Sequence, residues 1–317
     1  MKAVMLDWAT MGPDLDVGEL RALLPDLEFY DETDDDEIAQ RIAGAGIVLG
    51  NKVMISSALF AGAPELRFIG LTATGTDNID LDSARRHGVA VANIRAYCTE
   101  SVAEHVFGCL LNFTHNLHGY VADVRRGAWQ EASNFCMLTR PISELSAMTL
   151  GIVGYGELGK GVARIGKAFG MNVIVSARPG SDAVPEGRVP FDSLLANADV
   201  ISLHCPLTAA TRGLFCESEF RTMKKAAILI NTARGALVDS RALADALRDG
   251  EIAAAAIDVL PKEPPVDGDP LLDYDGDNLM VTPHIAWGTQ EARQAAVDEL
   301  TANIEAFLEG RERNRVV

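Results

Sequence analysis

A glycine-rich turn between two apolar runs limits what this chain can fold into more than any other stretch. Residues 149–179 read TLGIVGYGELGKGVARIGKAFGMNVIVSARP, and an apolar run at 150–153 leads directly into Gly154, Gly156 and Gly159. A helical pattern and a second apolar run follow. Glycines at this spacing favour a dinucleotide site, because they let the backbone approach a pyrophosphate at the helix N-terminus. A tight turn that binds nothing is the alternative. The helix is expected to bury a face made of Leu158, Val162, Ile165 and Phe169.

The same alternation of apolar runs and helical patterns extends along the whole chain of 317 residues. The other runs are at 3–6, 27–30, 47–49, 68–71, 89–92, 200–203, 226–230, 253–259 and 279–282. Strands that alternate with helices form parallel sheets that are covered on both faces. The sequence therefore predicts an α/β fold with two doubly wound parallel-sheet domains.

Helical patterns set the expected domain boundaries. They cover 17–24, 34–43, 81–87, 99–117 and 289–308, and Ser240 is the expected cap of one that runs through Leu247. We expect a Rossmann cofactor domain at 97–287, inserted into a flavodoxin-like substrate domain made of 1–96 and 288–317. The two crossings would form a hinge, and ligands are expected in the cleft beside it.

Composition narrows the class of partner. The net charge of −17 argues against nucleic acid, because a phosphate backbone would be repelled. The five cysteines show no CxxC pair and no metal-ligand spacing, so we expect reduced thiols, no bound metal and a cytoplasmic location. No apolar run reaches the roughly 18 residues that a membrane-spanning helix needs, and no long apolar signal segment opens the chain.

A segment at 120–147 has weaker periodicity than its surroundings. It contains Trp129 and the cluster Phe135, Cys136 and Met137. Exposed aromatic and apolar groups of this kind indicate an interface with another chain. The alternative is a loop that packs on its own domain.

Polar residues that directly follow apolar runs are candidates for chemistry, because the carboxyl ends of parallel strands face the ligand. Arg234 lies in NTARG, Asp258 closes the run at 253–259, Glu263 lies in PKEPP, and His284 lies in VTPHIAWGT. Taken singly, Arg234 could form a structural salt bridge, Glu263 could lie in a surface turn, and His284 could be an ordinary core or surface histidine. Four further residues follow the runs of the first domain and are expected to contact the substrate: Asn51, Lys52, Thr74 and Gly75.

Arg234, Glu263 and His284 together indicate the reduction of a carbonyl group. A protonated imidazole can donate a proton to an oxygen that gains negative charge, and a neighbouring carboxylate orients that imidazole. An arginine can hold a substrate carboxylate and polarise the adjacent carbonyl. A nicotinamide supplies the hydride, so neither a nucleophile nor a metal is needed.

The whole chain resembles the D-isomer-specific 2-hydroxyacid dehydrogenases. The resemblance rests on GYGELG, HCPLTAATRGLF, NTARGALVD, AAIDVLPKEPP and VTPHIAW, which occur in this order. It implies that Arg234 binds the substrate carboxylate and carbonyl, that Glu263 pairs with the histidine, and that His284 is the acid–base catalyst. It also implies a homodimer joined through the cofactor domains. With the turn glycines, the expected cofactor contacts are Thr99, Glu157, Leu158, Ala177, Arg178, Cys205, Pro206, Thr211, Thr232, Ala233, Arg234, Asp258 and His284.

Within that family, MKAVMLDWATMGPDLD, TATGTDNIDL and RAYCTESVAEHVF are most similar to glycerate dehydrogenases, also called hydroxypyruvate reductases. The resemblance implies that hydroxypyruvate or glyoxylate is reduced to D-glycerate or glycolate. Another 2-hydroxy acid is an alternative. A dinucleotide-sensing binding protein, like the corepressors that share the fold, is an alternative from another class.

The place about 20 residues past the glycines, which commonly holds an acidic residue that binds the adenosine ribose, holds Ala177 and Arg178. Without a carboxylate a 2′-phosphate is not repelled, and Arg178 could bind it. The sequence therefore favours NADP(H) over NAD(H). The alternative is that Arg178 is solvated and both cofactors are used.

Overall fold

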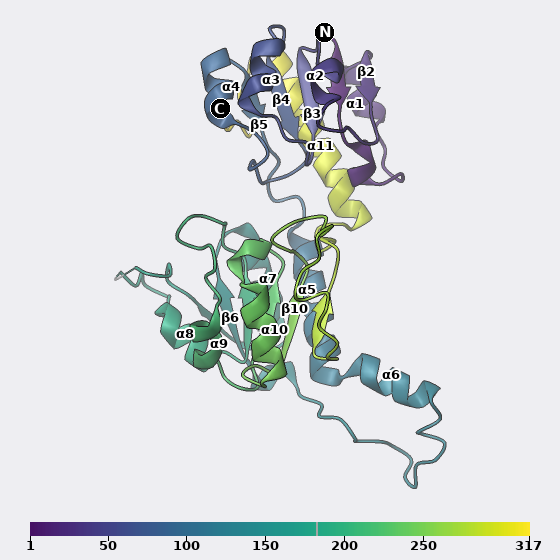
Figure 1. Cartoon of the computed structure of the whole chain (residues 1–317), viewed down its shortest axis with the longest axis vertical. Coiled ribbons are helices and arrows are strands. Elements are labelled where there is room, and N and C mark those ends of the chain that lie inside the picture. The colour runs from purple at the N-terminus through teal and green to yellow at the C-terminus, as the bar shows by residue number, and fades with distance from the viewer. Residues whose placement is uncertain (182) are drawn as a thin grey trace. The chain divides into compact units, whose positions relative to one another are not determined.

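A computed structural model describes residues 1–181 and 183–317 and divides into two units (Figure 1). Unit 1 comprises Met1–Cys98 and Gly288–Val317, and unit 2 comprises Thr99–Trp287. Each unit contains one parallel sheet with helices packed against it. This confirms the predicted fold class of two parallel-sheet α/β domains.

The sheet of unit 1 has five parallel strands in the order β2-β1-β3-β4-β5. The predicted runs form it almost residue for residue, because strands buried on both faces read as unbroken apolar segments. The strands are β1 (Ala3–Met5), β2 (Leu27–Phe29), β3 (Ile47–Gly50), β4 (Phe68–Leu71) and β5 (Ala90–Ala92). The helices are α1 (Gly18–Leu23), α2 (Ile38–Arg41), α3 (Ser57–Gly62), α4 (Leu81–His87) and α11 (Gln290–Leu308).

Helix α11 returns the chain to unit 1 by packing on β4. The ring of Phe307 stacks on that of Phe68 with centroids 4.7 Å apart. Leu300 lies so close to Gly70 that an added Cβ there would be 2.7 Å from its Cδ1. The buried Asn303 donates a hydrogen bond to the carbonyl of Asn93, over 2.9 Å.

The sheet of unit 2 has six parallel strands in the order β11-β10-β9-β8-β6-β7. The strands are β6 (Thr149–Val153), β7 (Asn172–Val175), β8 (Val200–Leu203), β9 (Ile228–Asn231), β10 (Ala254–Ile257) and β11 (Leu279–Val281). The helices are α5 (Thr99–His115), α6 (Leu117–Arg125), α7 (Glu157–Ala168), α8 (Phe191–Asn197), α9 (Glu217–Thr222) and α10 (Ser240–Arg248). A core of large apolar side chains, including Leu229, Phe215 and Phe220, lies between this sheet and α8 to α10.

Several helix predictions were wrong in detail. The pattern at 99–117 is two helices, because Asn116 adopts a left-handed conformation with φ of 49° and ends α5. The cap of α10 is Asp239, whose carboxylate accepts the N–H of Ala242, and not the adjacent Ser240. Only Ile38–Arg41 of the pattern at 34–43 is helical.

The buried face of α7 also differs from the prediction. Phe169 lies beyond the end of the helix, is partly exposed and stacks on Phe107 with ring centroids 5.2 Å apart. Of the other predicted residues, Val162 is buried, whereas Leu158 and Ile165 are half-buried; Ala163 and three glycines complete the buried face. An added Cβ at Gly161 would lie 2.5 Å from Thr99 Cγ2 of α5, so the two helices pack at a glycine.

Helix α6 and the loop that follows it project away from the sheet of unit 2 (Figure 1). Leu117, Val121 and Val124 form an exposed stripe along α6. In the loop, Phe135 is 91% exposed and Leu138 is 78% exposed. We call these five residues the apolar arm. Among the described residues, no helix is both long enough and apolar enough to span a membrane.

Candidate functional site

The carboxyl ends of the six strands in unit 2 line one edge of the sheet, because all the strands are parallel. Chain order reverses between β6 and β8, and a reversal of this kind is where α/β sheets bind ligands. The glycine turn follows β6 at this point. Each sequence-predicted cofactor residue belongs to unit 2, and most lie directly after one of its strands.

The glycine turn has the geometry that its sequence predicts. Gly154 has φ of +94°, and a Cβ added there would lie 2.4 Å from the backbone nitrogen of Cys205. A Cβ added at Gly159 would lie 2.1 Å from the carbonyl oxygen of Gly154, so α7 could not approach β6 with a larger residue. Gly156 faces open space, and no side chain caps α7 at its N-terminus, which begins with Glu157 and Leu158.

Two buried hydroxyls at this edge support the fit of a dinucleotide. The Oγ1 atoms of Thr99 and Thr232 are buried and have no hydrogen-bond partner within the described part of the chain. Buried hydroxyls are normally hydrogen-bonded, and a bound polar ligand would supply partners. Together with the open, uncapped helix start, these residues fit a dinucleotide cofactor.

The turn after β8 packs against Gly154 and forms one wall of the candidate cofactor site. Thr211 donates a hydrogen bond to the carbonyl of Pro206 over 2.7 Å, and Cys205 is buried. Burial raises the pKa of the Cys205 thiol and lowers the pKa of His204 to about 4. Both side chains are therefore neutral at physiological pH, and neither adds charge to this wall.

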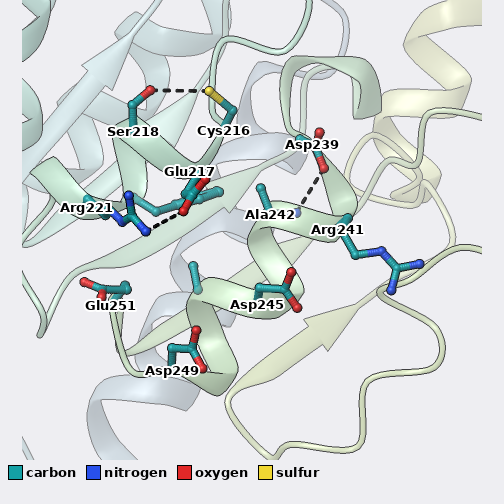
Figure 2. A pocket seen from close by; sticks show the side chains of 12 residues that line it. Cys216, Glu217, Ser218, Arg221, Asp239, Arg241, Ala242, Asp245, Asp249 and Glu251 are labelled. Atoms are coloured by element: carbon teal, nitrogen blue, oxygen red, sulfur yellow. Dashed lines mark hydrogen bonds and ion pairs between the residues drawn. The ribbon is translucent and has the colours of Figure 1, made fainter.

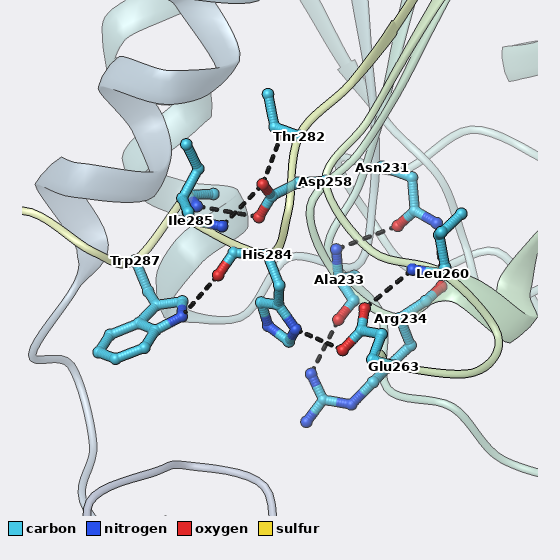
Figure 3. A network of polar contacts seen from close by, with 11 residues as sticks. Asn231, Ala233, Arg234, Asp258, Leu260, Glu263, Thr282, His284, Ile285 and Trp287 are labelled. Carbon is cyan, nitrogen blue, oxygen red and sulfur yellow. Dashed lines mark hydrogen bonds and ion pairs between the residues drawn. The ribbon is translucent and has the colours of Figure 1, made fainter. Parts of the chain in front are cut away.

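His284 and Glu263 form a hydrogen-bonded pair (Figure 3). His284 Nδ1 lies 2.6 Å from Glu263 Oε2, while Glu263 Oε1 accepts the N–H of Leu260 over 2.8 Å. A carboxylate can only accept, so Nδ1 carries the hydrogen and Nε2 is left for another group. The side chains are 25% and 33% exposed, which leaves both within reach of a ligand.

Arg234 points toward the same region as this pair (Figure 3). The next residue, Gly235, explains how the two segments meet. A Cβ added at Gly235 would lie 2.0 Å from the carbonyl carbon of Leu260, so only glycine lets the Arg234 loop pack against the loop that carries Glu263. The carbonyl of Ala233 accepts a hydrogen bond from Arg234 Nη1 over 2.8 Å.

Asp258 holds the segment that carries His284. Its carboxylate is 2% exposed and accepts the N–H groups of Ile285 and Ala286 and the hydroxyl of Thr282, over 2.8, 2.9 and 2.6 Å. Its carbonyl accepts the N–H of His284 over 2.8 Å. These bonds hold His284 at a φ of 56°, which is uncommon for a residue other than glycine.

A mostly apolar cavity of about 430 Å³ adjoins the His284–Glu263 pair. Leu260, Pro264, Leu272 and Val281 are among its lining residues, and Glu263 and His284 line it too. Apolar walls with a few polar groups are typical of small-molecule sites. The described residues of unit 2 alone therefore provide a pocket beside the pair.

At the end of β7, Ala177 is buried and Arg178 is exposed. The structure adds a residue here that the sequence analysis missed. Arg188 lies with its guanidinium carbon 4.8 Å from the ring centroid of Tyr155, the residue between Gly154 and Gly156. No local sequence signal marks Arg188, because the contact depends on how the loop after β7 returns.

Unit 1 brings its four predicted substrate residues to the ends of two neighbouring strands, β3 and β4. Asn51 is buried and donates to Thr10 Oγ1 over 3.0 Å. Thr74 donates to the carbonyl of Ile94 over 2.9 Å. Asn78 joins the loops by donating to the carbonyl of Asn51 over 3.3 Å, so Lys52 and Gly75 lie in connected loops.

A second cavity of about 700 Å³ lies between α9 and α10 (Figure 2). Some of its charged groups form contacts within the protein. Glu217 pairs with Arg221 over 2.5 Å, and Asp239 caps α10. The thiol of Cys216 donates to Glu219 Oε2 over 2.8 Å. We assign no ligand to this cavity.

The chain matches known proteins over most of its length. Residues 107–286 match the family described as D-isomer specific 2-hydroxyacid dehydrogenase, NAD binding domain. A glycerate dehydrogenase of Methylorubrum extorquens is 43% identical over 282 residues, which cover 89% of this chain and 88% of that protein. A hydroxypyruvate reductase of Blautia hydrogenotrophica is 36% identical, with 98% of each chain covered.

A solved structure agrees with these matches. The structure of a D-lactate dehydrogenase from Aquifex aeolicus, complexed with NAD and lactic acid, resembles this chain with a TM-score of 0.82. The two chains are 30% identical, and the likeness covers 98% of this chain and 96% of that one.

Proposed function

Because this chain belongs to the D-isomer specific 2-hydroxyacid dehydrogenases, we propose that it reduces hydroxypyruvate or glyoxylate to D-glycerate or glycolate with a nicotinamide dinucleotide. The observation that carries this proposal is the 2.6 Å contact between His284 and Glu263, beside the Arg234 loop and at the sheet edge where the glycine turn lies. The names of the relatives support the substrate class. Another small 2-keto acid is the alternative.

In this proposal, His284 is the acid–base catalyst. Reduction leaves negative charge on the carbonyl oxygen of the substrate, and His284 gives that oxygen a proton from Nε2. The donor is the protonated imidazole, in which Nε2 carries the proton that is transferred, while Glu263 holds the second hydrogen on Nδ1 and fixes the ring. Asp258 acts on the backbone around His284 and not on the ring.

Arg234 would bind the carboxylate of the substrate and polarise its carbonyl. Its planar guanidinium can form two parallel hydrogen bonds to a carboxylate. Asn51, Lys52, Thr74 and Gly75 are proposed as further substrate-binding residues. The nicotinamide supplies the hydride when it is bound.

The proposed cofactor is NADP(H) in preference to NAD(H). The glycine turn, Thr99 and Thr232 would hold either dinucleotide, with the remaining sequence-predicted contacts around it. The preference rests on Ala177 and Arg178, because no carboxylate follows β7 at the place where NAD enzymes commonly have one. The described cysteines are all free thiols, which supports the proposed cytoplasmic location.

The proposal is tested by mixing the purified chain with NADPH or NADH and a panel of small 2-keto acids, and by following the loss of absorbance of the reduced cofactor. We expect turnover with hydroxypyruvate or glyoxylate, faster with NADPH at equal concentration. Absence of turnover with all of the acids and both cofactors would contradict it. Dinucleotide binding without turnover would instead support the corepressor-like alternative.

We also propose that two copies of the chain associate through the apolar arm. Exposed apolar side chains that gather on one segment are typical of an interface, and these lie on a projecting segment of unit 2. Phe135→Asp with Leu138→Asp should convert a dimer to a monomer in analytical ultracentrifugation. A monomeric parent chain, or a double variant that remains a dimer, would contradict this proposal. Val184→Asp, at another exposed apolar residue, is the matched control.

A further inference from the structure

The segment around Val189 lies beside the carboxyl end of β7, the strand from which the chain has just departed. Ser176 forms a parallel bridge with Val189, the N–H of Ala177 donates to the carbonyl of Val189 over 2.7 Å, and the N–H of Val189 donates to the carbonyl of Val175 over 2.9 Å. The return lies outside β7, at the edge of the sheet. It brings Arg188 back to the carboxyl end of β7, ten residues after Arg178.

Two contacts hold Arg188 against the glycine turn. Its guanidinium lies over the ring of Tyr155, with the guanidinium carbon 4.8 Å from the ring centroid. Its Nη1 donates to the carbonyl of Ser176 over 3.2 Å. Stacking on a ring fixes the orientation of the guanidinium plane and of its remaining N–H groups. An arginine in solvent has no such fixed orientation.

Arg178 and Arg188 both lie in the segment after β7, which also contains Asp182 and Glu186. Neither Arg178 nor Arg188 forms an ion pair within residues 1–181 and 183–317, whereas Arg164 and Arg221 pair with glutamates. The net charge is −17, and Ala177 occupies the position of the common carboxylate. Two arginines at one strand end would give an anion both charge and hydrogen-bond donors.

We infer that Arg188, stacked on Tyr155, is the principal group that selects the 2′-phosphate of NADP(H), with Arg178 in a lesser role. The inference rests on the proposed dinucleotide site and names the residue that sets its preference. Arg188 is held by two contacts near the glycine turn, whereas Arg178 is exposed and has no such support from residues 1–181 and 183–317. A held donor loses less conformational freedom when it binds, so Arg188 should contribute more.

The test uses ligands without nicotinamide, so that binding is measured apart from turnover. Titration calorimetry of the full chain with 2′,5′-ADP and with 5′-AMP gives the preference for the 2′-phosphate as a ratio of Kd values. Arg188→Ala should weaken 2′,5′-ADP binding by roughly tenfold or more and leave 5′-AMP binding within about twofold, where tenfold corresponds to 1.4 kcal/mol. Arg178→Ala should weaken 2′,5′-ADP binding by less.

Matched variants separate the contributions of charge, stacking and folding. Arg188→Lys keeps the charge but loses the planar set of N–H donors, so it should retain only part of the preference for 2′,5′-ADP over 5′-AMP. Tyr155→Leu removes the ring under the guanidinium, so it should weaken 2′,5′-ADP binding more than 5′-AMP binding. A thermal melt of each variant checks that it folds.

The outcomes distinguish this inference from the proposed function. If the folded Arg188→Ala variant keeps the parent's preference, or if Arg178→Ala alone removes it, the inference is wrong. If the parent binds 5′-AMP but shows no preference for 2′,5′-ADP, the inference also fails while the dinucleotide site stands. If neither nucleotide nor either whole cofactor binds, the proposed site itself is wrong.

Discussion

The two sheets reverse their strand order in the same way, but different residues lie at the point of reversal in each sheet. In unit 1 the reversal lies between β1 and β3, and the buried carboxylate of Asp7 occupies it. That carboxylate accepts the N–H groups of Asn51, Lys52 and Val53 over 2.9, 2.6 and 3.1 Å. In unit 2 the reversal lies between β6 and β8, where Gly154 and Gly156 stand and no side chain caps α7.

This difference shows how one topology serves two purposes. In unit 1 the protein supplies its own anion to the backbone N–H groups, so the loop after β3 is held in place. In unit 2 a glycine with open space around it leaves the helix start accessible to an anion from outside. The topology creates the edge in both units, and the difference lies in whether a side chain of the protein occupies the backbone N–H groups at the point of reversal.

The largest effect that this comparison of the two sheets predicts comes from giving unit 2 the carboxylate that unit 1 has. Gly156 has φ of −77° and no neighbouring atom within 4 Å of an added Cβ, so Gly156→Asp should fold normally. Aspartate is a favourable helix cap, and Tm should stay equal or rise. Its charge would repel a pyrophosphate, so Kd for NADPH in a fluorescence titration should rise by roughly a hundredfold.

The control for this prediction is Gly156→Asn, which has the same shape without the charge. It should weaken NADPH binding much less than Gly156→Asp does. Equal Kd values for the two variants would mean that charge is not the cause, and the comparison between the sheets would lose its basis.

A smaller effect is predicted for the converse change in unit 1. Asp7→Asn keeps one acceptor but loses the charge, and hydrogen bonds to charged groups contribute about 1.5 to 3 kcal/mol. We expect the free energy of unfolding, from urea titration, to fall by about 2 kcal/mol. NADPH binding should stay within about twofold of the parent. A variant of unchanged stability would show that Asp7 does not hold the loop.

The smallest effect concerns another carboxylate of unit 1, the α4 cap Asp80. Hydrogen bonds from the backbone N–H and then the hydroxyl of Ser83 lower the pKa of Asp80. A group whose pKa is lowered by folding stabilises the protein above its unfolded pKa, about 3.9, and loses that effect as pH falls. Asp80→Asn should therefore lower Tm slightly at pH 7, and the difference should shrink toward pH 3. A difference that grows on acidification would contradict this assignment.

The strands could be predicted because parallel strands buried on both faces leave an unbroken apolar run, and β8 matches its prediction at both ends. Helix ends were harder. Asn116 ends α5 through a left-handed conformation that asparagine tolerates without any proline or glycine to mark it. Asp239 and Ser240 are both good caps, so the sequence could not choose between them.

The residues of the candidate site also divide into those that could be predicted from the sequence and those that could not. The glycines, Arg234, Glu263 and His284 could be found because each follows a strand or stands in a family motif. Asp7 and Arg188 could not, because their contacts reach across 44 and 12 residues to Asn51 and Ser176 and depend on the folded path of the chain. The hydrogen bonds from Ile285 and Ala286 to the carboxylate of Asp258 could not be predicted either, because the donors are backbone N–H groups that no sequence pattern marks.

In the proposed reaction His284 transfers the proton, whereas binding of the cofactor depends mainly on the glycine turn. The direct test compares His284→Ala with the parent in two measurements, turnover of hydroxypyruvate or glyoxylate and Kd for NADPH. We predict that kcat falls by roughly 10² to 10⁴ while Kd changes by less than about threefold. An equal loss in both, or an unchanged kcat, would contradict the role assigned to His284.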